Sequence, residues 1–86
     1  MVGTKVINLR NAVDAELFNP VQLSDMAKQL GLARSDTPCI SVANGDWNTQ
    51  GHRVTAASIQ SGYIIVHFDA AITGPYRINW ILGFVQ

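Results

Sequence analysis

The sequence predicts an α+β fold in which one N-terminal helix packs with an antiparallel β-meander of about four strands. Two patterns lead to this class. Helix-boundary residues surround the segment Pro20–Leu30, and short strand-like stretches separated by turn residues fill the chain after Ser35. Sequential strands joined by short turns usually pair antiparallel. A helical part over residues 1–34 and a meander over residues 35–86 are expected to form one domain, residues 1–86.

The start of the helix carries the strongest local signals. Asn19 is a favourable N-cap, and Pro20 stands at the first helical position, where its missing N–H costs nothing. Gln22 can bond back to the cap and complete a capping box. Phe18 can pack on Leu23 as a hydrophobic staple. The helix should therefore begin at Pro20.

The end of the helix is marked by Gly31, which suits the left-handed position after a C-terminus. The apolar residues of the segment recur at helical spacing and predict a stripe that faces the core. That stripe consists of Leu23, Met26, Ala27 and Leu30.

Strand patterns occur on both sides of the helix. Ser61-Gly62 predicts a tight hairpin turn, and Thr73-Gly74-Pro75 predicts the end of a loop. The stretch from Asn11 to Glu16 fits neither period. The predicted strands are Thr4–Leu9, Cys39–Ala43, Arg53–Gln60, Tyr63–Asp69 and a final strand from Tyr76.

Charge is scarce in this chain. Charged residues make up 14% of it, six basic and six acidic, against roughly 25% in an average soluble domain. A neutral surface of this kind favours burial in an oligomer. No basic excess is present to bind a phosphate backbone, so nucleic acid is not an expected partner. No apolar run reaches the ~18 residues of a membrane span and the N-terminus lacks a secretion signal, so synthesis in the cytoplasm is expected.

Residues that carry catalysis or bind metals are few. His52 and His67 have no metal-ligand spacing, and no cofactor motif is present. No pattern brings a serine, a histidine and an aspartate within mutual reach, so an enzyme is not expected. Cys39, the one cysteine, lies in the apolar stretch TPCISVA and is predicted to be a buried structural thiol rather than a reactive one.

The loop NGDWNTQGH is the first candidate site. A flat indole beside amides and a carboxylate suits a sugar ring, whose C–H face packs on the aromatic ring while its hydroxyls bond to the polar groups. The alternative is that the indole folds inward and caps the core. The candidate carbohydrate-binding residues are Trp47, Asn44, Asp46, Asn48, Gln50 and His52.

The last strand is the second candidate site, because it becomes apolar on both faces. One face carries Tyr76, Ile78, Trp80, Leu82 and Phe84, of which Ile78, Trp80 and Leu82 are expected to meet the core. The opposite face loses its polar character after Asn79. The helix can cover only one face of the sheet, so the other face is expected to meet another copy of the chain. The candidate oligomer-interface residues are Tyr63, Ile65, Arg77, Asn79, Ile81 and Val85.

The stretches SGYIIVHF and GPYRINWILG in the C-terminal half carry a family resemblance. This half resembles the distal C-terminal domain of bacteriophage tail fibres and tailspikes. The resemblance implies a homotrimer in the virion tail that serves trimer assembly, binding of bacterial surface polysaccharide, or both. The alternative is a small phage- or mobile-element-encoded protein that binds and inhibits a partner protein through the same strand.

Overall fold

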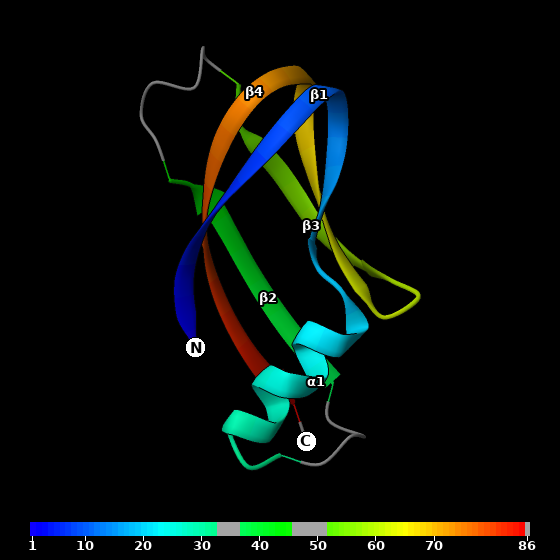
Figure 1. Cartoon of the computed structure of the whole chain (residues 1–86), viewed down its shortest axis with the longest axis vertical. Coiled ribbons are helices and arrows are strands. Elements are labelled where there is room, and N and C mark those ends of the chain that lie inside the picture. Colours follow the sequence, from blue (N-terminus) through cyan, green and yellow to red (C-terminus); the bar gives the residue numbers. More distant parts are fainter. Residues whose placement is uncertain (33–36, 46–51, 86) are drawn as a thin grey trace.

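The computed structural model describes residues 1–32, 37–45 and 52–85. It is mostly antiparallel β-sheet, with four strands and one short helix, so the antiparallel pairing is as predicted (Figure 1). The strands are divided differently, because the predicted strands Tyr63–Asp69 and Tyr76 onward form one long strand. The helix is not N-terminal, because a long strand precedes it, and that part of the prediction is wrong. The elements in chain order are β1 (Val2–Phe18), α1 (Pro20–Gln29), β2 (Thr37–Asn44), β3 (Val54–Gln60) and β4 (Tyr63–Val85).

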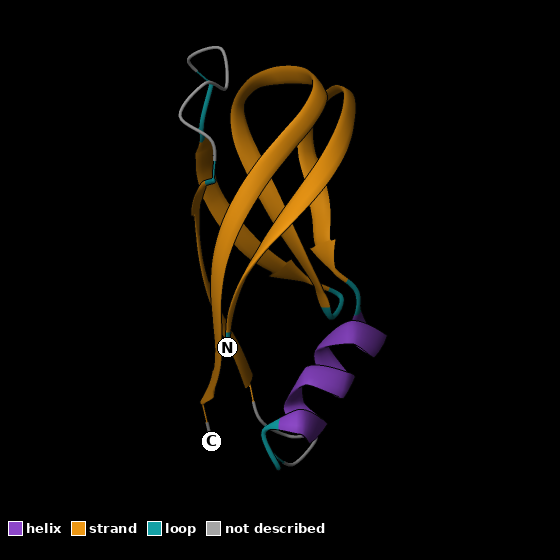
Figure 2. Cartoon of the chain, turned by 60° about the vertical axis from the view of Figure 1, so that its left-hand side comes forward, coloured by secondary structure: helices purple, strands orange, loops and turns teal. Residues whose placement is uncertain are grey.

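The two long strands, β1 and β4, form an antiparallel ribbon that folds over on itself (Figures 1 and 2). The first half of β1 pairs with the second half of β4, and the second half of β1 pairs with the first half of β4. Register shifts on both sides of Ala12 mark the bend. There Asn11 has a φ of 51° and its N–H donates to Thr73 Oγ1 at 3.0 Å, while Gly74 has a φ of 106°. Such bulges bend and twist a strand, which brings the two halves of the ribbon face to face.

The predicted loop at Thr73–Pro75 does not interrupt the sheet, because β4 runs through it as one strand. Backbone N–H and C=O groups at odd positions of β4 point toward β2, as the hydrogen bond from Gly45 N to Arg77 O at 2.8 Å shows. The N–H that Pro75 lacks would therefore also point toward the β2 side of the strand. The β2 ladder ends at Asn44↔Ile78, so no strand requires the N–H that proline lacks. β1 and β2 flank β4, and β3 also pairs with β4, so the sheet is not a meander.

The core lies between the two facing halves of the folded sheet. Rings from opposite halves meet edge to face: Phe68 contacts Tyr76 and Phe18 contacts Trp80, each with centroids 5.0 Å apart. Even-numbered positions of β4 point inward, as predicted for its last part. The buried core residues are Leu9, Leu17, Phe18, Leu23, Ile64, Val66, Phe68, Ile72, Tyr76, Ile78 and Leu82.

Gly3 makes room for the largest of these rings. It lies opposite Trp80 in the β1–β4 register, and a Cβ atom at Gly3 would stand 2.4 Å from Cζ2 of the indole. Only glycine therefore lets the ring lie across β1. Within the described part of the chain, Trp80 Nε1 is the one buried side-chain polar atom without a hydrogen-bond partner, and the ring packs on Phe18.

The local signals at the start of α1 are confirmed. Gln22 N donates to Asn19 Oδ1 at 2.8 Å and Asn19 N donates to Gln22 Oε1 at 2.9 Å, which is the predicted capping box. Phe18 and Leu23 are both buried in the core. The helix therefore begins where its capping residues predict.

The end of α1 also follows its signal. Gly31 has a φ of 73°, and Leu32 N donates to Ala27 O at 2.9 Å. The helix lies at the open end of the folded sheet, beside the lower ends of β2 and β4 (Figures 1 and 2). Leu23 and Ala27 are buried against the core, whereas Leu30 is 45% exposed, so the predicted stripe is wrong at Leu30.

The hairpin between β3 and β4 is as predicted. Gln60 pairs with Tyr63, and the two residues between them, Ser61 and Gly62, have φ values of 51° and 81°. Two successive positive φ angles define the tight turn whose twist matches that of paired strands.

Candidate functional site

Exposed apolar side chains gather on the outer face of the half-sheet formed by β1, β4 and β2. The register sets Val2 beside Ile81 and Ile81 beside Ser41, so one row crosses all three strands. The exposed fractions are 75% for Val2, 59% for Ile81, 57% for Val85 and 51% for Val6. We call this surface the outer patch; it consists of Val2, Thr4, Val6, Cys39, Ser41, Ala43, Arg77, Asn79, Ile81 and Val85.

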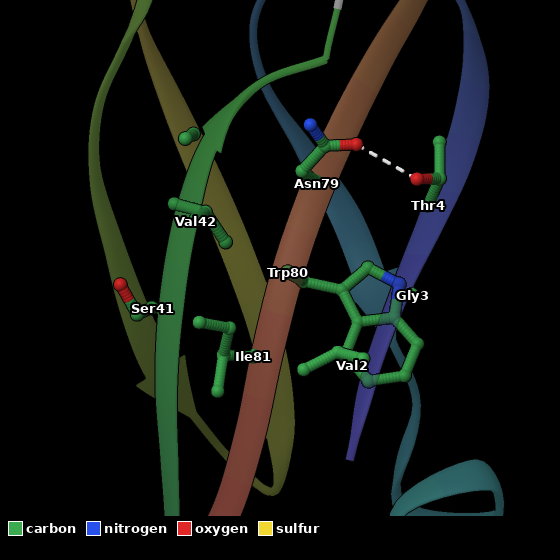
Figure 3. Close-up of a pocket in the computed structure, with 9 residues that line it drawn as sticks. Val2, Gly3, Thr4, Ser41, Val42, Asn79, Trp80 and Ile81 are labelled. Carbon is green, nitrogen blue, oxygen red and sulfur yellow. Dashed lines mark hydrogen bonds between the residues drawn. The ribbon is translucent and has the colours of Figure 1, made fainter.

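The centre of the outer patch is a shallow, open hollow of about 450 Å³ (Figure 3). Its polar side chains are partly satisfied within the chain, since Thr4 Oγ1 donates to Asn79 Oδ1 at 2.7 Å. Most of the surface of the hollow is apolar. It is lined by Val2, Gly3, Thr4, Ser41, Val42, Ala43, Asn79, Trp80 and Ile81.

The predicted interface residues divide between two surfaces. Four of them, Arg77, Asn79, Ile81 and Val85, are exposed and lie on the outer patch. Tyr63 and Ile65 do not extend this surface, contrary to expectation. They precede the fold-over of β4, so they point outward from the other half of the sheet, on the opposite side of the core.

Sequence reasoning missed the contribution of β1 to this surface. Val2 and Val6 are among its most exposed apolar side chains. Val2 and Val6 alternate with Gly3, Lys5 and Ile7, which indicates that the two valines share one face of a strand. The sequence does not show that this strand pairs with the last strand, so it could not place the valines beside Ile81.

Cys39 is exposed, so the prediction of a buried thiol is wrong. β2 is a half-buried strand rather than a fully buried one. Its even positions, such as Ile40 and Val42, pack toward the core, and its odd positions point to solvent. Cys39 lies opposite Gly83 on β4, within the outer patch.

Asn44 and His52 flank the tryptophan loop, and both serve the fold. Asn44 Oδ1 accepts from Val54 N at 3.0 Å and from the Tyr76 hydroxyl at 2.7 Å, while Asn44 Nδ2 donates to His52 O at 3.3 Å. His52 Nδ1 lies 3.4 Å from Asp69 Oδ1. These contacts hold the two ends of the loop together. The other predicted saccharide-binding residues, Trp47, Asp46, Asn48 and Gln50, lie outside the described residues.

Two residues of this loop base, Tyr76 and Asp69, were not predicted. The Tyr76 side chain is buried and reaches Asn44 from the middle of β4. Asp69 also accepts from Arg53 N at 3.3 Å. A tyrosine among buried apolar positions implies a hydrogen-bond partner, but the sequence does not say which one.

Among the described residues one serine–histidine side-chain pair is formed, whereas the sequence predicted no serine, histidine and aspartate within mutual reach. Ser58 Oγ lies 2.8 Å from His67 Nε2, and Gln60 Nε2 donates to Ser58 Oγ at 2.9 Å. Asp14 is the register partner of His67, but among the described residues no hydrogen bond joins its carboxylate to the ring. The pair lies on the outer face of the second half-sheet, which is formed by the second half of β1, the first half of β4 and β3. It links β3 to β4 as a cross-strand contact.

Three further findings bear on function. In the described ranges, no helix is long and apolar enough to cross a membrane. Nor does any group of three or more histidine, cysteine, aspartate or glutamate residues there have the geometry to hold a metal ion. Comparison with known proteins gives no match among family models, curated proteins or solved structures.

Proposed function

We propose that this chain is an assembly domain that binds further copies of itself through the outer patch and performs no catalysis. The observation that supports this proposal is the patch itself: four exposed apolar side chains, Val2, Val6, Ile81 and Val85, on one continuous three-stranded face. Exposed apolar clusters of this kind typically mark an interaction surface.

The lack of charge favours a second copy over a different partner. Arg77 is the one charged residue of the outer patch, and the whole chain has a formal net charge of zero. Binding of an unlike protein is usually steered by complementary charge, which this face does not offer. A neutral apolar face is complementary to itself.

The fold leaves this face available to a partner. The inner face of the half-sheet is covered by the other half of the same sheet, and α1 closes the open end (Figure 2). No described element packs over the outer patch, so burial of its valine and isoleucine side chains requires another molecule. Burying a full side chain of this size is worth roughly 1.5–3 kcal/mol.

The biological setting that we propose follows from the resemblance of the C-terminal half. A self-associating domain suits the distal end of a phage tail fibre or tailspike. Binding of bacterial polysaccharide is the less supported part of that role, because the amide of Asn44 is used inside the fold.

The mass of the purified chain in solution tests this proposal. Light scattering coupled to gel filtration should show a mass above one copy at micromolar concentration. Ile81→Asp should lower that mass, because the association would bury a carboxylate without a partner. A wild-type chain that stays monomeric would instead favour the partner-binding alternative.

A further inference from the structure

The first half of β1 is an open edge of the sheet. It pairs with β4 from Val2↔Ile81 to Leu9↔Gly74 without a register shift. No described strand pairs with its other side. An edge of this kind presents a row of backbone N–H and C=O groups to solvent or to another chain.

The hydrogen bonds show which residues present those groups. Met1 and Leu82 exchange two backbone bonds, each 2.7 Å long, so they form a hydrogen-bonded pair. Such pairs alternate with pairs that direct their backbone groups away from the partner strand. The backbone groups of Val2, Thr4, Val6 and Asn8 therefore face the open edge.

The other described edges carry features that hinder pairing. The same alternation turns the backbone of Pro38, on β2, toward the free side, where it offers no N–H. The second half of β1 carries exposed Asp14 and Glu16 and two register shifts. β3 has seven residues and a register shift after Val54. The first half of β1 has neither proline nor bulge.

Lys5 is the one charged side chain between Val2 and Leu9. A charge that points inward from an edge strand can block pairing. Here, however, Nζ donates to Leu17 O and lies 5.3 Å from the centre of the Phe18 ring. The ammonium group is thus held within its own molecule, and the edge beside it stays open.

We propose that the first half of β1 pairs antiparallel with the same segment of a second copy, across a two-fold axis at Thr4. In this register Val2 lies opposite Val6 of the second copy, which places two β-branched side chains in a favourable cross-strand pair. Lys5 lies opposite Gly3 of the second copy. An axis at Lys5 would instead set Thr4 opposite Val6 and Val2 opposite Asn8, which loses both valine pairs.

This inference rests on the proposed self-association and names one contact through which two copies associate. Val2, Thr4 and Val6 belong to both the edge and the outer patch, so edge pairing joins two patches into one larger face. The resulting assemblies contain an even number of copies, in contrast to the three that the resemblance implies.

Thr4→Pro tests the edge contact. Proline removes an N–H that faces the edge, and no β1–β4 hydrogen bond depends on it. Thr4→Ala is the matched control, because it also loses the side-chain bond to Asn79 but keeps the N–H. Thr4→Pro should weaken self-association at least tenfold relative to Thr4→Ala, with unchanged far-ultraviolet circular dichroism. Equal association of two folded variants would overturn the proposal.

Cysteine crosslinking tests the register without depending on a proline. In a Cys39→Ser background, Thr4→Cys should form a disulfide-linked dimer under mild oxidation. Asn8→Cys should not, because the two copies of residue 8 would lie about 26 Å apart along the paired strands. A self-associating chain that shows no Thr4→Cys crosslink, or that contains three copies, would overturn edge pairing but leave the proposed function in place. A monomeric wild-type chain would overturn both.

Discussion

Replacement of Ile81 by aspartate perturbs the outer patch at its centre. Ile81 lies between Val2 and Ser41, and 59% of its side chain is exposed in the single chain. If association covers that fraction, each copy gains about 1–2 kcal/mol from this side chain. If both copies bury Ile81 at the contact, the variant loses about 2–4 kcal/mol of association free energy. The association constant then falls roughly 30- to 1,000-fold.

The assay is sedimentation velocity over a concentration series, with the variant and a matched control. Val13→Asp is that control, because Val13 is 56% exposed but lies at the bend of β1, away from the outer patch. Both substitutions are on the surface and should leave the free energy of unfolding of the single chain within about 1 kcal/mol. Equal association constants for the two variants would refute the assignment of the interface to this face.

Three further predictions concern stability, measured by the free energy of unfolding in denaturant. Gly3→Ala should cost about 1–3 kcal/mol, because its Cβ would stand 2.4 Å from the rigid ring of Trp80, and an unchanged stability would show that the ring lies elsewhere. Asn19→Ala should cost about 0.5–2 kcal/mol through loss of the capping box, and no effect would mean that the helix begins at another residue. Tyr76→Phe should cost about 0.5–1.5 kcal/mol, because its hydroxyl bonds to Asn44 at the base of the tryptophan loop; a neutral result would remove the loop-anchoring role.

The parts of the fold that local chemistry determines could be predicted from the sequence. The capping box at Asn19 and the left-handed Gly31 depend on residues within one turn of each other. The Ser61-Gly62 turn is equally local. The inward and outward faces of the last part of β4 follow from the period of two, which the core positions Ile78 and Leu82 obey.

The parts that depend on long-range pairing could not be predicted. The bend of β1 near Asn11 breaks the alternation, since Val13 and Asp14 are both exposed, and this hid the second half of the strand. Thr73-Gly74-Pro75 has turn chemistry but lies inside β4, where no neighbouring strand requires the proline N–H. The predicted interface lacked Val2 for the same reason, because Val2 joins the outer patch only through its pairing with Ile81.

Self-association of the wild-type chain is the most direct test of the proposed function. Sedimentation equilibrium from low to high micromolar concentration measures the mass of the assembly without any substitution. We predict a species of two or more copies that dissociates on dilution toward the 9.4 kDa chain. A mass of 9.4 kDa across the whole concentration range would contradict self-association through the outer patch.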